Sequence, residues 1–176
     1  MLYLPLGKFL SCDRAEWQGI FDKEISLMIQ QAKLAGWQKD QAVAAYPLIV
    51  GFLKSDLAQR IYRLEKAGGP VYREVPFTLA IPALGLDHTI EGNAKEQTLV
   101  QGMIDLWFLE DGQAVLLDYK SDIIQGSYQE KRDTLRQRYQ VQLDYYSLAI
   151  QRIMGLKEPV KERLIWLFRD RQAYRL

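Results

Sequence analysis

The feature that most constrains this chain is a pair of acidic residues placed inside two apolar strand patterns. The segment 98–122, TLVQGMIDLWFLEDGQAVLLDYKSD, predicts two β-strands joined by a tight turn at Asp111-Gly112, a dipeptide that favours hairpins. Asp105 stands where the first strand should be apolar, and Asp118 ends the apolar run of the second. Side chains alternate between the two faces of a strand, so Asp118 and Lys120 point to the same face. That face therefore carries a carboxylate beside an ammonium group.

Charges among isoleucine, leucine and valine cost several kcal/mol of stability unless they are paired or bind a metal. Two interpretations of these charges stay open. In one, Asp118 and Lys120 form a buried salt bridge and Asp105 is an acid at a strand end. In the other, the two aspartates bind a divalent cation, because Mg²⁺ prefers carboxylate oxygens and keeps several waters. Lys120 would then stabilise a phosphate or help to activate a water.

The composition indicates an ordinary globular protein. The chain has 176 residues, 48% hydrophobic and 26% charged, which predicts one domain over 1–176 with a substantial core. The 23 Lys and Arg balance 22 Asp and Glu, so overall charge does not indicate nucleic-acid binding, although a local basic patch would suffice. We expect a cytoplasmic protein without membrane contact, since the sequence has no apolar run that spans a bilayer and no signal-peptide pattern.

The scarcity of cysteine and histidine limits the kinds of metal site. Cys12 and His88 are the single residues of their types, which excludes a Cys₄ zinc site, an iron–sulfur cluster and a multi-histidine zinc site built from this chain alone. Any metal must be held mainly by oxygen. We assign no role to His88, and the absence of a G-x-x-x-x-G-K-[ST] loop argues against a nucleotide cofactor.

The first 70 residues predict a mainly helical layer that covers a sheet. One helix is expected from Asp13 to about residue 35, before Gly36. A second begins at Asp40 and should kink or break at Pro47. Ser55 is the expected N-cap of a third helix, which ends at the Gly-Gly-Pro run 68–70.

Residues 71–176 predict the sheet core and one long helix. A strand over 71–81 contains Pro76, which favours a sheet edge. Within this strand Glu74 follows Arg73. Either both side chains are solvated neighbours, or Glu74 supplies a third carboxylate to the site. The segment 161–169 predicts a final strand before a basic tail.

A strongly helical segment runs from about 129 to 154 and should end near Gly155. Its predicted inward stripe consists of Leu135, Tyr139, Gln142, Tyr146, Ala149 and Ile153. Gln142 needs hydrogen-bond partners in such a stripe: it either ties the helix to the sheet or contacts DNA. The opposite edge carries Lys131, Arg132, Arg136 and Arg138, which form either a solvated face or a phosphate-contacting patch.

Taken in order, these motifs are Arg73-Glu74, G-x-x-D at 102–105, D-x-K at 118–120 and Q-x-x-x-Y at 142–146. The series resembles the RecB-type branch of the PD-(D/E)XK nuclease superfamily. Within that branch, REVPF, LVQGMID, LLDYKSD and RYQVQLDYY resemble the C-terminal nuclease domain of AddA/RexA-type helicase-nuclease subunits. The resemblance implies an α/β, restriction-endonuclease-like fold, with a mixed central sheet flanked by helices, and a chain that is a C-terminal fragment of a larger protein.

The resemblance also implies a function and a site. Asp105 and Asp118 match the metal ligands, Lys120 the catalytic lysine, and Glu74 the acid of the R-E-x-P-F strand. Gln142 and Tyr146 match the helix motif, and Arg136 and Arg138 are the expected DNA contacts. The implied activity is Mg²⁺-dependent hydrolysis of DNA, with Mn²⁺ as a substitute and exonuclease action favoured, during double-strand-break processing and recombinational repair. The implied partners are single-stranded DNA or duplex ends and an AddB/RexB-type subunit.

The chain departs from that family pattern in two respects. A metal-binding histidine on an N-terminal helix is missing, because no histidine precedes His88. The cysteine cluster of the iron–sulfur members is missing as well. Two alternative functions follow: a catalytically silent nuclease-like module that binds DNA or another subunit, and a stand-alone endonuclease or resolvase of the same superfamily.

Overall fold

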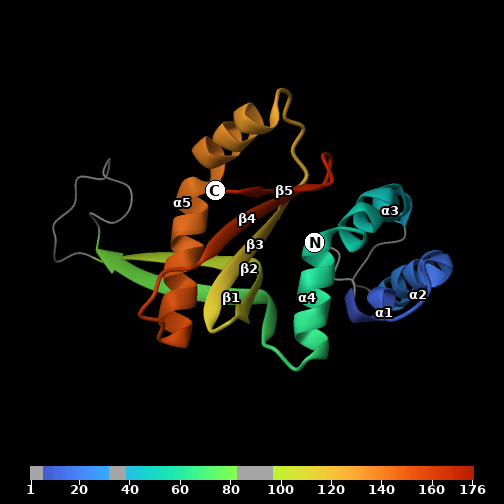
Figure 1. Ribbon diagram of the computed structural model, residues 1–176, viewed down its shortest axis with the longest axis horizontal. Helices are drawn as coiled ribbons and strands as arrows, with labels where there is room; N and C mark the ends of the chain where they lie inside the picture. Colours follow the sequence, from blue (N-terminus) through green and yellow to red (C-terminus); the bar gives the residue numbers. More distant parts are fainter. Residues whose placement is uncertain (1–5, 32–38, 83–96) are drawn as a thin grey trace.

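A five-stranded mixed sheet forms the centre of the computed structural model, which describes residues 6–31, 39–82 and 97–176 (Figure 1). The strands follow the spatial order β1 (Val71–Pro82), β2 (Gln97–Glu110), β3 (Gln113–Lys120), β4 (Glu162–Leu167) and β5 (Gln172–Arg175). β3 and β4 are parallel, and the other three neighbouring pairs are antiparallel. The expected α/β class, with a mixed sheet and helices consistent with a restriction-endonuclease-like fold, is confirmed.

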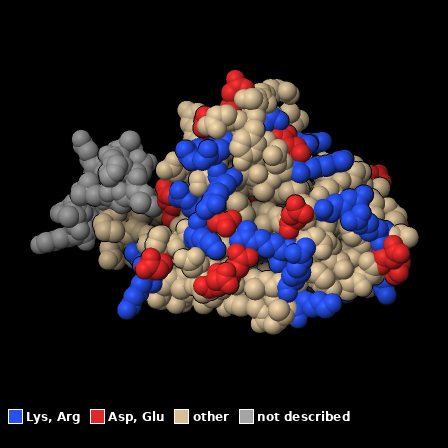
Figure 2. Space-filling view, in the orientation of Figure 1, with Lys and Arg blue, Asp and Glu red and all other residues tan. Residues whose placement is uncertain are grey.

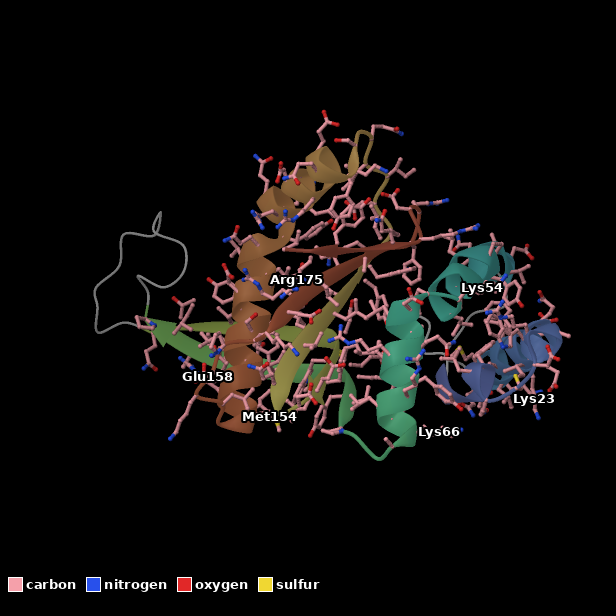
Figure 3. All side chains as sticks on the ribbon, viewed as in Figure 1. Lys23, Lys54, Lys66, Met154, Glu158 and Arg175 are labelled. Atoms are coloured by element: carbon pink, nitrogen blue, oxygen red, sulfur yellow. The ribbon has the colours of Figure 1, made fainter. Side chains whose placement is uncertain are left out.

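Helices cover both faces of this sheet. α1 (Leu6–Leu10), α2 (Trp17–Gln30), α3 (Lys39–Leu53) and α4 (Asp56–Lys66) lie on one side, and α5 (Tyr128–Met154) lies on the other (Figure 1). α5 is the connection between the parallel strands β3 and β4, which need a crossover of this length. Figure 3 shows the two layers apart, with Lys66 at the end of α4 and Met154 at the end of α5.

Two hydrophobic cores result, one on each face. Along β3, Val115 and Leu117 face α1–α4, whereas Leu116 faces α5, as strand alternation requires. The largest residues of the first core are Phe9, Trp17, Phe21, Phe52, Phe108 and Trp166, and those of the second are Phe77, Trp107, Tyr146 and Tyr174. Asp118 is on the α5 face, where its carboxylate lies near Gln142 of that helix.

Several local predictions are confirmed. Asp111 and Gly112 form the hairpin turn with φ values of 52° and 76°, both in the left-handed region that such turns require. Ser55 caps α4 and accepts a hydrogen bond from the Ala58 amide at 3.1 Å. Gly155 ends α5 with a φ of 62°, and β1 with Pro76 is the edge strand.

Other predictions of local structure were wrong. The break that was one of two expected outcomes at Pro47 does not occur, because α3 continues through Pro47 from Lys39 to Leu53, with α2 and α4 packed against it. α2 ends earlier than expected, at Gln30. The basic tail was not expected to form a strand, yet 172–175 folds back onto β4 as β5. Ile153 is 51% exposed, because the inward face of α5 follows Leu143 and Ile150 instead.

Some predictions concern residues outside the described ranges. His88 and the expected helix end at Gly36 both belong to this group. Within the described ranges, no helix is both long and apolar enough to cross a membrane.

Candidate active site

Asp118 is the one buried charged residue in the described part of the chain, with 1% of its surface exposed. It is near the end of β3, beside its parallel partner Ile165 on β4. The Nζ atom of Lys120 is 2.6 Å from Asp118 Oδ2, but this ion pair lacks hydrogen-bond geometry. Among the described residues, the Lys120 ammonium is thus the one polar partner of this buried oxygen. The predicted Asp118–Lys120 pair therefore exists, as a largely buried ion pair.

The surroundings of Asp118 favour its protonated form. Burial raises the pKa of its carboxyl from 3.8 to about 6, against the opposing attraction of Lys120. The negative charges of Asp105 and Asp122 raise this pKa further. At neutral pH such a carboxyl is already mainly ionised, at a cost in free energy that the positive charge of a bound cation would reduce.

Gln142 on α5 connects the helix to these two charges. Its Oε1 accepts a hydrogen bond from Lys120 Nζ at 3.2 Å, and its Nε2 donates to the Tyr146 hydroxyl at 2.6 Å. Nε2 also lies 3.5 Å from Asp118 Oδ1. The structure thus brings together four of the predicted site residues, and Gln142 and Tyr146 are held by each other and by the strand charges.

Asp105 lies where β2 and β3 separate. The paired part of these strands begins at Leu106 and Leu117, one residue beyond Asp105 and Asp118. Asp105 Oδ2 accepts a hydrogen bond from the Tyr119 amide at 2.9 Å. The carboxylate thus accepts the bond that a backbone carbonyl of the neighbouring strand would otherwise accept. The two predicted metal ligands are therefore on neighbouring strands, and their charges are coupled.

Glu74 stands opposite Asp105 in the β1–β2 ladder, between the pairs Arg73–Leu106 and Val75–Ile104. Its φ of 50° is unusual for a residue other than glycine in a strand. The alternation of side chains between the two sheet faces also shifts at this point on β2. Ile104 and Trp107 are three residues apart, yet both pack into the core beneath α5. Glu74 is exposed, and the described residues contain no cluster of three acids, histidines or cysteines that would hold a metal.

Gly102 of the G-x-x-D motif has a steric role. A Cβ atom at this position would lie 2.8 Å from Phe77 Cε1 and 3.6 Å from Tyr146 Cε1. The Phe77 and Tyr146 rings meet edge to face over this glycine, with centroids 5.6 Å apart. The absence of a side chain at 102 therefore leaves room for the Phe77 ring, which packs against Tyr146.

The basic edge of α5 is partly neutralised within the protein. Arg138 pairs with Asp122 at 3.1 Å and Lys131 pairs with Asp170 at 2.7 Å. Arg136 is half-buried, and half of the Arg138 side chain is exposed. Figure 2 shows Lys and Arg gathered over the middle of one face with Asp and Glu among them. This face is mixed in charge rather than uniformly basic.

Two residues at the site were not identified from the sequence as functional. The Tyr139 ring centroid is 4.5 Å from Lys120 Nζ, and the Tyr139 hydroxyl donates to Asp122, 2.9 Å from each carboxylate oxygen. The feature of the sequence that could have identified them is their spacing from predicted site residues. Asp122 follows Lys120 by two residues, and Tyr139 precedes Gln142 by three. Helical spacing alone gave Tyr139 a place in the stripe without a function.

No protein-family model matches the chain, but curated relatives do. The ATP-dependent helicase/nuclease A subunit of Clostridium beijerinckii is 37% identical over 121 residues, which is 68% of this chain. The proteins of the same name from Bacillus mycoides and Bacillus cereus are 33% and 31% identical, over 85% and 83% of this chain. The chain spans between 9% and 12% of the length of these relatives. It belongs to the family of ATP-dependent helicase/nuclease A subunits, as a homologue of one segment of those longer proteins.

Proposed function

We propose that this chain is a Mg²⁺-dependent nuclease domain that hydrolyses DNA phosphodiester bonds. The observation that carries the proposal is Asp118, a buried carboxylate that pairs with Lys120 and lies near the negative charge of Asp105 on the neighbouring strand. The relatives' name, which joins a helicase and a nuclease, supports this activity over a purely structural role. The word subunit in that name also fits a partner subunit. DNA ends as the substrate, repair as the process and an AddB/RexB-type partner belong to the proposal through the motif resemblance alone.

The residues present fit a divalent cation held by few protein ligands. Asp105 and Asp118 offer carboxylate oxygens from neighbouring strands, and Mg²⁺ characteristically keeps several waters beside one or two carboxylates. The raised pKa of the buried Asp118 carboxyl favours a cation at this point, because added positive charge would lower the cost of the ionised form. When bound, Mg²⁺ or Mn²⁺ would supply polarisation of the scissile phosphate and a more acidic water.

The remaining residues act on the substrate and on one another. Lys120 places a fixed positive charge beside the aspartates, where it can stabilise negative charge that develops on a phosphate oxygen. Gln142 orients the Lys120 ammonium, and Tyr146 orients the amide of Gln142. Arg136 and Arg138 would contact the DNA backbone, and Arg138 would exchange Asp122 for a phosphate. Glu74, being exposed opposite Asp105, would act on a water rather than as a buried ligand.

Cleavage of labelled DNA tests the proposal. A 5′-labelled single strand, a blunt duplex and circular single-stranded DNA are incubated with Mg²⁺ or Mn²⁺, and the circle separates endonuclease from exonuclease action. We expect Asp118→Asn and Lys120→Met to lower the rate at least about 100-fold, because the first removes a ligand of the cation and the second removes positive charge at the reacting phosphate. Asp133→Asn, which changes an exposed acid on α5, should cleave at the wild-type rate.

Two results would contradict the proposal. Cleavage by Asp118→Asn at the wild-type rate removes this residue from the chemistry. A wild-type chain that is inert with both metals, and stays inert when residues preceding it in the parent protein are added, favours the silent module that binds DNA or another subunit. The specific observation behind that alternative is that the described residues provide no third acidic, histidine or cysteine ligand.

A further inference from the structure

We propose that Tyr139 and Asp122 form a positioning pair that holds the Lys120 ammonium in place and keeps a second carboxylate away from it. The inference rests on the proposed function, since it concerns the lysine assigned to that reaction. Neither residue is assigned to contact DNA or metal. Both act through Lys120.

The ammonium of Lys120 is enclosed by three different groups. Asp118 lies on one side at 2.6 Å, Gln142 Oε1 accepts its hydrogen bond at 3.2 Å, and the Tyr139 ring lies 4.5 Å away. Lysine is a flexible side chain with many rotamers, so each contact restricts its position. The ring attracts the cation without neutralising it, which leaves the positive charge for a phosphate.

Tyr139 is itself fixed by Asp122. Its hydroxyl lies 2.9 Å from both oxygens of this carboxylate, which also pairs with Arg138 at 3.1 Å. Burial and the hydrogen bond to Asp122 raise the pKa of Tyr139 to about 12, so the hydroxyl remains a donor at neutral pH. The ring over Lys120 is thus tied down at its far end.

The same hydrogen bond determines where Asp122 is directed. Asp122 follows Lys120 by two residues, close enough for its charge to raise the pKa of Asp118. In the described structure its oxygens are directed to Tyr139 and Arg138, and the carboxylate paired with Lys120 is Asp118. Without the Tyr139 hydroxyl, Asp122 would be held only by the half-exposed Arg138 and could turn to pair with Lys120, which would cancel the charge needed at the phosphate.

The test compares variants that separate the ring from the hydroxyl. Tyr139→Leu removes both, Tyr139→Phe removes the hydroxyl, and Tyr139→Phe with Asp122→Asn also removes the negative charge that the hydroxyl restrains. Tyr62→Leu is the matched control, because Tyr62 is a half-buried tyrosine 6.0 Å from Lys66 on α4, across the sheet (Figure 3).

Two readouts are measured. The first is kcat and KM for cleavage of labelled single-stranded DNA with Mn²⁺. The second is the NMR chemical shift of the Lys120 ε-methylene protons. The Tyr139 ring should move this signal upfield, and its loss in Lys120→Arg assigns it to Lys120. The shift requires neither metal nor activity. A wild-type chain that stays inert even with the preceding residues of the parent protein therefore contradicts the proposed function, and the shift still decides the positioning pair.

For Tyr139→Leu we expect kcat to fall about 10–100-fold with KM changed less than about twofold, as for groups that orient a reacting residue. The upfield shift should disappear. Tyr139→Phe should lose roughly threefold to tenfold in kcat, and adding Asp122→Asn should restore most of this loss because the neutral amide cannot neutralise Lys120. Tyr62→Leu should match the wild type.

Three results would overturn the inference. One is wild-type kcat and an unchanged Lys120 shift in Tyr139→Leu. Another is a rise in KM at constant kcat, which would make Tyr139 a DNA contact. The third is failure of Asp122→Asn to rescue Tyr139→Phe. If Tyr139→Leu does not fold by circular dichroism, the Tyr139→Phe pair of variants decides.

Discussion

Replacing Asp118 by asparagine should stabilise the metal-free protein at neutral pH while abolishing its metal response. Asp118 is 1% exposed, and burial raises the pKa of its carboxyl from 3.8 to about 6. The ionised carboxylate is therefore unfavourable in the folded state relative to the unfolded state. Asparagine has nearly the same shape and carries no charge, so the substitution removes this cost.

The magnitude follows from the pKa difference. The interval between 3.8 and about 6 corresponds to about 3 kcal/mol, at about 1.4 kcal/mol per pH unit. Between these pH values the folded protein holds a proton that the unfolded chain has released, so stability falls as pH rises through this window. The full cost is present above pH 6. The pKa of about 6 already includes the attraction of Lys120, so the loss of this counter-ion is contained in that figure, and we expect a net gain of about 1–3 kcal/mol at pH 7.5.

Urea denaturation of wild type and Asp118→Asn measures this difference from pH 4.5 to 7.5 in EDTA. The gain in free energy of unfolding should grow across the window and become constant above about pH 6.5. With Mg²⁺ in excess the order should reverse, because a ligand that binds the folded state stabilises the wild type alone. Asp133→Asn should show neither effect. A variant that is less stable than the wild type in EDTA at pH 7.5 would refute the reasoning.

Two further substitutions test the packing and the charges around the site. Gly102→Ala should lower the free energy of unfolding by about 1–3 kcal/mol, because its Cβ would lie 2.8 Å from Phe77. Adding Phe77→Leu to this variant should recover part of the loss. Urea denaturation measures both effects, and an unchanged stability in Gly102→Ala would contradict the steric role. Arg60→Met should cost a similar amount near neutral pH, since Arg60 bridges Glu110 and Glu162 and holds the pKa of both carboxyls below their usual range. That stability is present above the unfolded pKa of about 4.5 and is lost as pH falls below it, so wild type and variant should converge in acid.

Interactions close in the chain could be predicted from the sequence because their partners are near neighbours. The Asp111-Gly112 turn fixed the β2–β3 hairpin, and strand alternation placed Asp118 beside Lys120. The cap at Ser55 followed from residue type and spacing. Even here local rules had limits: Ser127 and Glu130 form a capping box that begins α5, and we did not predict it.

The sequence by itself therefore determined the hairpin, its two acids and its lysine, together with the oxygen-ligand character of any metal site. Only the tertiary structure decided how α5 meets β3, which puts Gln142 against Lys120 and directs Tyr139 to Asp122. It also decided that β5 folds back on β4 and that strand alternation shifts at Glu74 and Asp105. These features depend on partners far apart in the chain, whose contacts arise from the packing of whole layers rather than from local pattern.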